Sequence, residues 1–150
     1  MIECYEHAGF AVMALDCLLI ETLQQFREGK AETSGNKSKD YFVRFLTDTA
    51  FGDFFTKEMA IKFYQQIRCG ILHQAETKEN SRLLIREHTP LVAQTPDGRG
   101  LIINRRLFHS QLVRVFDEYI SSLRDPSHAE LRSNLRKKMD HICRNTPSQP

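Results

Sequence analysis

Apolar side chains spaced three or four residues apart dominate the start of the chain. This spacing marks one face of an α-helix, and it predicts a long amphipathic helix from about residue 3 to residue 26. The residues that carry the pattern are Tyr5, Ala8, Val12, Leu15, Leu19, Leu23 and Phe26. Gly29 should end this helix, because glycine readily takes the left-handed conformation of a helix end. Residues 29–39 (GKAETSGNKSK) are polar and lack periodicity, so we expect a loop.

Helical patterning returns after this loop. The run YFVRFL at 41–46 is followed by a pause around Phe51-Gly52-Asp53, and Thr56 is a suitable N-cap for another helix. In that helix Phe63, Ile67 and Ile71 lie four residues apart.

A different pattern covers about residues 82–104. Three short apolar runs, at 83–85, 91–92 and 101–103, are separated by the turn-forming sequences Thr89-Pro90 and Thr95-Pro96-Asp97-Gly98. They predict a small β-hairpin or three-strand element inserted in a helical protein.

Two helices should follow. Asn104 is a suitable N-cap for a helix at 105–123, which Asp125-Pro126 ends, and Ser127 can cap a last helix at 128–143. Their predicted inner faces are Leu107, Phe108, Leu112, Val115, Phe116, Tyr119 and Ile120, then Leu131, Leu135, Met139 and Ile142. The expected fold is therefore mostly α: an up-and-down helical bundle with a small β element.

Length and composition favour one domain spanning residues 1–150. A chain of this size can bury a real core, and 41% hydrophobic with 27% charged residues is typical of globular proteins. Asp16 interrupts the apolar run at 10–20, which is too short to span a bilayer, so we expect no membrane segment. Four cysteines without a CxxC pair favour reduced thiols in the cytoplasm.

Positive charge is concentrated near the end of the chain. Residues 1–103 hold 12 basic and 14 acidic side chains, whereas residues 104–150 hold 9 and 5. This excess is consistent with phosphate-backbone contacts or simply with a solvated helix face. The candidate nucleic-acid-binding residues are Arg105, Arg106, Arg136, Lys137 and Lys138.

Arg68 and His73 are the candidate catalytic residues. A histidine can take or give a proton near neutral pH, and an arginine can contact two phosphate oxygens at once. On a regular helix five steps of about 100° put them about 140° apart. We therefore expect the helix to loosen around Gly70 so that the two side chains converge.

The sequence resembles the HEPN superfamily (higher eukaryotes and prokaryotes nucleotide-binding domains), small helical bundles of which many cleave RNA. Residues 4–28 are similar to the family's first long helix, and Arg68-Cys-Gly-Ile-Leu-His73 fits its Arg-x4-6-His signature. Two further helices follow, with the strands as an insertion. The resemblance implies a metal-independent endoribonuclease without cofactors that acts as a homodimer on RNA. It also implies a possible toxin or antiviral defence role, with an antitoxin or regulatory protein as partner.

Two positions differ from the family pattern. Active members commonly have Asn, Asp or His directly after the arginine, where this chain has Cys69, a further candidate site residue. Some toxin members carry a tyrosine two positions after the histidine, which a partner nucleotidyltransferase modifies, and here that position is Ala75.

Two carboxylates on the first helix are candidate supports for Arg68. Glu21 and Asp16 lie in an otherwise apolar stretch, where an unpaired carboxylate is costly, so either is a candidate to hold Arg68 by a charge-assisted hydrogen bond. The alternative is that one or both carboxylates lie on an exposed edge of that helix, and it is favoured more for Asp16 than for Glu21. Cys4 with His7 and His141 with Cys143 lack a compact metal-binding pattern, so no metal site is expected.

Three functions remain in competition. The first is the HEPN-like endoribonuclease, and the second is a non-catalytic HEPN-like module that binds RNA or nucleotide or regulates a partner. The third is a helical interaction scaffold in which the Arg68–His73 spacing has no function.

Overall fold

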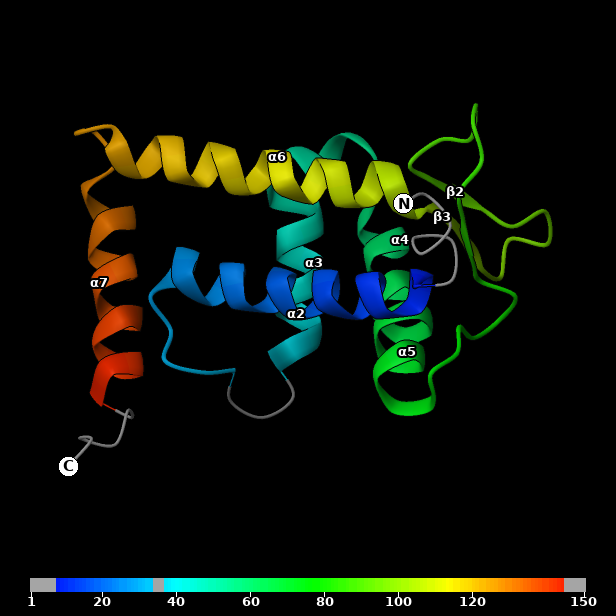
Figure 1. Ribbon diagram of the computed structural model, residues 1–150, viewed down its shortest axis with the longest axis horizontal. Helices are drawn as coiled ribbons and strands as arrows, with labels where there is room; N and C mark the ends of the chain where they lie inside the picture. Colours follow the sequence, from blue (N-terminus) through cyan, green and yellow to red (C-terminus); the bar gives the residue numbers. More distant parts are fainter. Residues whose placement is uncertain (1–7, 34–36, 145–150) are drawn as a thin grey trace.

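The computed structural model describes residues 8–33 and 37–144 (Figure 1). Its α-helices are α2 (Gly9–Glu28), α3 (Ser38–Asp48), α4 (Lys57–Lys62), α5 (Cys69–Gln74), α6 (Arg105–Arg124) and α7 (Ala129–Arg144). A short 3₁₀-helix, η2 (Ala50–Asp53), precedes α4, and a π-helical segment, η3 (Phe63–Arg68), joins α4 to α5. The strands are β1 (Arg82–Leu84), β2 (Val92–Gln94) and β3 (Leu101–Asn104).

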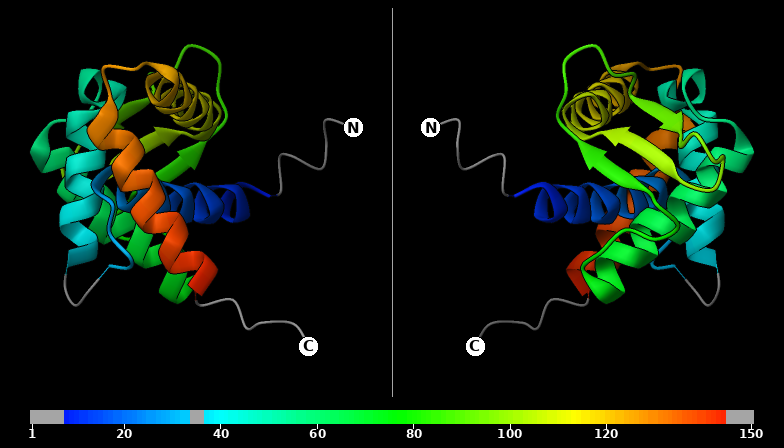
Figure 2. Two further views of the ribbon diagram at one scale, coloured as in Figure 1. Left: turned by 90° about the vertical axis from the view of Figure 1, so that its left-hand side faces the viewer. Right: turned by 90° about the vertical axis from the view of Figure 1, so that its right-hand side faces the viewer.

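The helices form the body of the molecule and the strands lie at one end of it. In Figure 1, α2 and α6 run alongside one another, and α3, the α4–α5 helix and α7 cross them. The side views of Figure 2 show the small sheet next to the start of α6. The prediction of a mostly-α fold with a small β element is confirmed.

Three of the predicted helix boundaries are set by the expected residues. Gly29 follows α2 with φ of 63°, and its N–H bonds back to the carbonyls of Gln25 and Phe26. Thr56 accepts a hydrogen bond from the Met59 N–H at 3.2 Å, and Asn104 accepts one from the Leu107 N–H at 3.3 Å. Each contact satisfies a backbone group that the helix itself leaves without a partner.

The β element is a three-stranded mixed sheet in the order β1-β3-β2. β1 pairs with β3 in parallel, with Leu83 opposite Ile103, and β2 pairs with β3 antiparallel, with Ala93 opposite Ile102. The sheet is attached to η3 through the buried Gln66 side chain. Its amide nitrogen donates to the carbonyl of Arg99 at 2.9 Å, and its amide oxygen accepts from the Ser81 hydroxyl at 2.8 Å.

A cluster of phenylalanines forms the centre of the core. The rings of Phe63 and Phe108 stack with centroids 5.1 Å apart and planes 9° from parallel, and Phe51 lies 4.9 Å from Phe108. Phe42, Phe45 and Phe55 complete the cluster through further ring contacts. These rings join α3, η2, η3 and α6, so they fix the helix that carries Arg68 against the rest of the protein.

The helix that carries the candidate catalytic residues loosens one turn earlier than predicted. The chain is helical without interruption from Lys57 to Gln74, and the wide turn covers Phe63–Arg68, where the N–H of Cys69 reaches back five residues to Tyr64. Gly70 instead lies inside regular α-helix, and its role is steric. A Cβ there would lie 2.4 Å from the Glu76 carbonyl oxygen, so glycine lets the chain fold back after α5.

The prediction of the buried side of α2 was partly wrong. Leu15 is 65% exposed and Leu19 is 38% exposed, although both were placed on the inner face. The buried side is lined by Met13, Asp16, Cys17, Ile20, Leu23 and Gln24. Because residues 10–20 are apolar almost all round, their spacing could not decide which side meets the core.

The prediction of the buried faces of α6 and α7 was also partly wrong. Leu107 and Phe116 on α6 and Met139 and Ile142 on α7 are each about 40% exposed or more. These apolar side chains lie on the surface of the protein rather than in its core.

α2 is the one helix in the described part of the chain whose length and hydropathy would also suit a membrane span. A core helix of a soluble protein passes the same test, and α2 has contacts with α3, α5, α6 and α7. One third of its apolar window is buried against these helices, and the rest is partly or fully exposed.

The phenylalanine cluster predicts a large difference between two substitutions. Phe63→Ala should lower the free energy of unfolding by about 3–5 kcal/mol, because it removes a fully buried ring that stacks on Phe108. Phe54→Ala is the matched control, since Phe54 is 42% exposed, and it should cost less than about 1 kcal/mol. Urea denaturation followed by circular dichroism measures both, and equal losses would contradict the assigned core.

Candidate functional site

Arg68 lies at the end of η3 and is held by a carboxylate from α2. Its Nη2 donates to Oε2 of Glu21 at 3.1 Å, and the Ser38 hydroxyl donates to the same oxygen at 3.0 Å. The two charged side chains are only 16% and 17% exposed. Glu21 thus joins the start of α3 to the end of η3, and it is the carboxylate that supports Arg68.

Two aromatic rings complete the surroundings of the guanidinium. The Arg68 Cζ lies 5.3 Å from the ring centre of Tyr64 and 5.9 Å from that of Phe42, within range of cation–π attraction. Burial by itself would lower the pKa of Arg68, but Tyr64, Glu21 and Cys69 outweigh it and raise that pKa. Arg68 is therefore a permanent, positioned positive charge, and its buried Nε has no hydrogen-bond partner among the described residues.

His73 lies one and a half turns further along, on the exposed side of α5. All residues between Arg68 and His73 are in regular α-helix, so the wide turn before Arg68 does not rotate the two side chains toward each other. Regular helix geometry puts positions five residues apart about 140° apart, and here Arg68 is directed to Glu21 on α2 while His73 is exposed to solvent. The expected convergence within one chain is therefore not formed.

Cys69 is partly exposed and lies beside Arg68, whose guanidinium it contacts through its side chain. The thiol of Cys17, opposite on α2, is buried, and this burial together with Asp16 raises its pKa to about 12. A thiol with such a pKa stays protonated and is a poor nucleophile at neutral pH. Cys17, Cys69 and Cys143 are all free thiols, and Cys4 lies outside the described residues.

Asp16 supports a different residue from the one predicted. It is 3% exposed rather than on an exposed edge, and its Oδ1 lies 2.8 Å from Nδ1 of His109 on α6. Its other oxygen, Oδ2, is buried and has no hydrogen-bond partner within residues 8–33 and 37–144. Burial raises the pKa of Asp16, and the hydrogen bond and charge of His109 offset part of that rise. Nothing local in the chain marks this pair, because its members lie 93 residues apart.

Two of the five basic residues predicted for nucleic-acid contact are buried. Lys138 is 8% exposed, and its Nζ donates to the Gln25 side-chain oxygen at 2.7 Å and to the Ala31 carbonyl. Arg105 is 6% exposed, and its side chain lies against Gly9. A Cβ added at residue 9 would lie 3.2 Å from the Nε of Arg105. These two side chains are therefore buried rather than on the surface, whereas Arg106, Arg136 and Lys137 are exposed cations.

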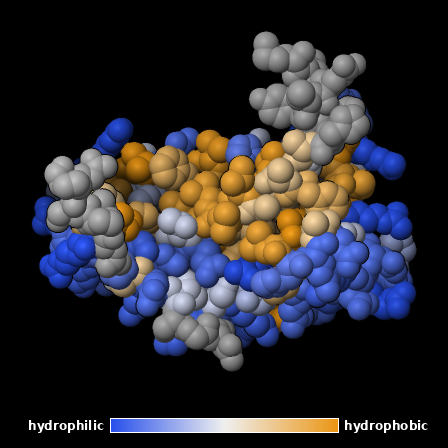
Figure 3. Space-filling model, turned by 60° about the horizontal axis from the view of Figure 1, so that its bottom comes forward, coloured by the Kyte–Doolittle hydropathy of each residue, from blue (hydrophilic) through white to orange (hydrophobic). Residues whose placement is uncertain are grey.

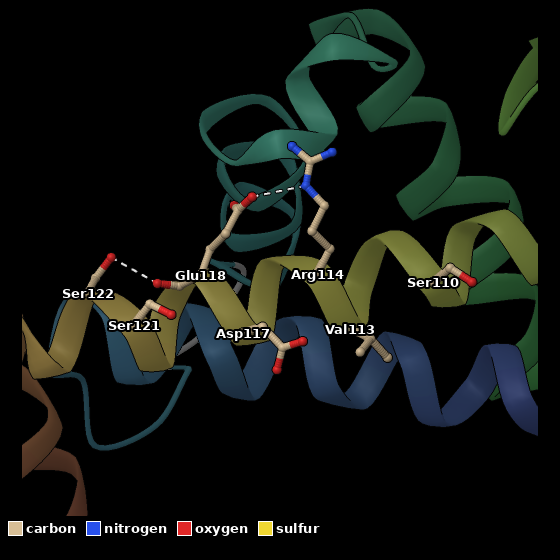
Figure 4. A pocket seen from close by; sticks show the side chains of 7 residues that line it. All are labelled: Ser110, Val113, Arg114, Asp117, Glu118, Ser121 and Ser122. Carbon is tan, nitrogen blue, oxygen red and sulfur yellow. Dashed lines mark hydrogen bonds and ion pairs between the residues drawn. The ribbon is translucent and has the colours of Figure 1, made fainter.

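A surface hollow of about 590 Å³ lies along α6, away from Arg68 and His73. It is lined by seven residues of that helix, among which Arg114 and Glu118 form an exposed ion pair at 3.0 Å (Figure 4). All its walls come from one helix, so it offers no converging groups. Within residues 8–33 and 37–144, no three His, Cys, Asp or Glu side chains are grouped as metal ligands, and Cys4 and His7 lie outside these ranges.

The pairing of Glu21 with Arg68 should be measurable as a coupling free energy. In a double-mutant cycle of Glu21→Ala with Arg68→Ala, we expect about 1–3 kcal/mol of coupling, because both groups are largely shielded from water. The pair Arg114–Glu118 is the control, since its side chains are 57% and 52% exposed, and it should show about 0.5 kcal/mol or less. Urea denaturation of the four proteins in each cycle gives the two coupling free energies. Equal values would contradict the statement that the Glu21–Arg68 pair is shielded from water.

Asp16 predicts a pH dependence with a definite sign. Its folded-state pKa is raised, so the folded protein keeps a proton that the unfolded chain releases near pH 4. The stabilisation from Asp16 is therefore present at low pH and is lost as the pH rises from about 4 toward the raised folded pKa. Asp16→Asn, which cannot titrate, should gain stability relative to wild type over that range. Unfolding free energies measured at several pH values check this, and a constant difference would contradict it.

The comparisons with known proteins add no relative. No protein-family model matches the chain, and no curated protein or solved structure is similar enough to count as a match. Any assignment of function therefore rests on the residues and geometry described above.

Proposed function

We propose that this protein is a metal-independent endoribonuclease of the HEPN type that acts as a homodimer. The observation that carries the proposal is the state of Arg68: a guanidinium fixed by Glu21, shielded by aromatic rings and followed within the same helix by an exposed histidine. The π-helical turn that ends at Arg68 is a further support, because such turns are rare and frequently occur at functional sites.

The chemistry requires three groups. The 2′-hydroxyl of the RNA must lose a proton to a base, the leaving 5′-oxygen must gain one from an acid, and the phosphorane-like transition state needs a positive charge. The 2′-oxygen then bonds to phosphorus while the bond to the 5′-oxygen breaks, which leaves a 2′,3′-cyclic phosphate. His73 is suited to proton transfer because its imidazole is open to solvent, and Arg68 is suited to stabilise the added negative charge.

One chain does not supply this set of groups. Arg68 and His73 are directed to different sides of their helix, and one histidine is not both acid and base in a single step. In a two-fold symmetric dimer, two Arg68–His73 pairs would be available, so that His73 of one subunit acts beside Arg68 of the other. Toxin or defence activity, with a regulatory protein as partner, would be consistent with such a nuclease.

One observation favours a second candidate, a non-catalytic module that binds RNA or nucleotide. Glu21 already neutralises Arg68, and the residue after the arginine is Cys69 rather than a further polar group. In this alternative Arg68 and His73 would contact phosphate without proton transfer. RNA binding by gel shift that persists in His73→Ala, with no cleavage by the wild type, would decide for this alternative.

His73→Ala should abolish RNA cleavage, with a loss of at least about 100-fold in rate, and leave the fold intact, because the side chain is exposed. His128→Ala is the matched control, since His128 is also an exposed histidine near a helix end. The assay is incubation with total RNA in chelator, with detection of 2′,3′-cyclic phosphate ends. Cleavage by His73→Ala at the wild-type rate would rule out the proposed site.

A further inference from the structure

α2 presents an uncharged apolar stripe to solvent. Its exposed positions between Phe10 and Thr22 are Phe10, Ala11, Leu15, Leu18, Leu19 and Thr22. Leu15 and Leu18, in the middle of the helix, are 65% and 52% exposed. Figure 3 shows an extended apolar area on one face of the molecule, and an area of this kind on a soluble protein marks an interaction surface.

The stripe has the spacing of a helix–helix seam. Ala8, Ala11, Leu15, Leu18, Thr22 and Gln25 follow one another at alternating intervals of three and four residues, as the a and d positions of a coiled coil do. In a buried helix, the same spacing would mark the face that is directed into the protein's own core. Here the central positions of the seam point to solvent, so no helix among residues 8–33 and 37–144 packs against them.

The middle of the seam is roughly symmetric about a point between Leu15 and Leu18. The two leucines are the inner pair, and the smaller Ala11 and Thr22 are the next pair. The symmetry ends there, because Gln25 is larger than Ala8 and bonds to Thr33 and Lys138 of its own chain. If a second α2 packs antiparallel about that point, each Leu15 meets Leu18 of the partner subunit, and the small residues on either side allow close approach. The part of the seam from Ala11 to Thr22 is therefore complementary to itself.

The flanks of α2 favour a second copy over a lipid surface. The Asp16–His109 pair lies along one side of the stripe and the Glu21–Arg68 pair along the other, so charges that are already paired border it on α2. A helix that binds a membrane surface typically carries Lys or Arg beside its apolar face, whereas residues 9–26 contain neither. An uncharged strip also lets two copies meet without repulsion.

Neighbouring residues of α6 extend the same surface. Val113 and Phe116, 44% and 39% exposed, lie one and two turns beyond His109 on the side of α6 that meets α2. They widen the contact toward the size that a stable dimer interface needs.

We infer that two copies of this chain associate through the antiparallel pairing of their α2 seams, with Leu15 of each copy against Leu18 of the other. The inference rests on the homodimer of the proposed function and specifies its contact surface. The two-fold axis passes between the midpoints of the two α2 helices and is perpendicular to both of them. It therefore places both Arg68–Glu21 pairs on the same edge of the dimer.

Complementary charges at the paired leucines test this arrangement in the full-length chain. Sedimentation velocity at about 1–100 µM should show a wild-type dimer, and Leu15→Glu and Leu18→Lys should each weaken association by at least about 100-fold. An equimolar mixture of these two variants should regain the dimer, because the glutamate of one chain then faces the lysine of the other. Leu107→Lys is the matched control, since Leu107 is 45% exposed on the opposite side of α6 from His109, and it should remain dimeric.

Several results would overturn the inference. They are a monomeric wild type over the whole range, dimers that persist in both single variants, or a mixture that stays monomeric although each variant shows the wild-type circular dichroism spectrum. Co-sedimentation of a monomeric wild type with vesicles of equal parts phosphatidylcholine and phosphatidylglycerol, lost in Leu15→Glu, would assign the stripe to a membrane surface instead.

Cleavage of RNA is measured separately on the same proteins. A wild-type dimer that is lost in the seam variants but never cuts RNA supports the interface and refutes the nuclease. A wild type that cuts RNA as a monomer supports the nuclease chemistry and refutes the interface.

Discussion

The stacked rings of Phe63 and Phe108 are the contact on which the arrangement of this protein depends. They join the helix of residues 57–74 to α6, and Phe51 packs against the same ring of Phe108. The chain has no tryptophan, and the rings of this cluster are all phenylalanine. A phenylalanine ring has no polar atom that needs a hydrogen-bond partner. The cluster can therefore be dry and fully buried. It fixes the end of η3 in space, and with it the position of the Arg68 side chain.

The wide turn that ends at Arg68 connects this core to the sheet and to α2. A π-helical turn adds one residue to the helical register, so it rotates everything after it by about 100°. It also frees a carbonyl: that of Gln66 accepts from the N–H of Lys78 at 2.9 Å, while the Gln66 side chain bonds to the sheet. The loosened backbone is thus paired elsewhere, which stabilises a turn that would otherwise be unfavourable. Glu21 then receives the guanidinium that this rotation directs toward α2.

The sequence predicted what local chemistry determines and missed what depends on distant partners. The helix boundaries at Gly29, Thr56 and Asn104 were correct, because a cap or a left-handed residue acts on its own helix. The three short strands were likewise marked by the proline and glycine residues between them. A helix that is apolar all round gives no such local signal, so the exposed side of α2 at Leu15 was assigned to the core.

Buried charges were the second source of error, for a related reason. Composition cannot tell whether a lysine lies in water or spans a gap between elements, and Lys138 proved to connect α7 to the loop after α2. Asp16 and His109 form a pair only because α2 and α6 pack side by side. The Glu21–Arg68 pair is among the predicted arrangements because a carboxylate in an apolar helix and the Arg-x4-His spacing mark its two members, whereas no local pattern marks Ser38 and Tyr64 around it.

Helix geometry decides how Arg68 and His73 can work together. Side chains five residues apart on a regular α-helix diverge, whatever the rest of the protein does, and here the intervening residues are regular. Joint action on one phosphate would therefore require groups from two helices, and a second subunit would supply a second Arg68–His73 pair. The uncharged seam of α2 lies next to the Glu21–Arg68 pair, so association through it would bring a second such pair to the same edge. The exposed leucines of α2 and the exposed histidine of α5 then have one common explanation, which neither has in an isolated chain.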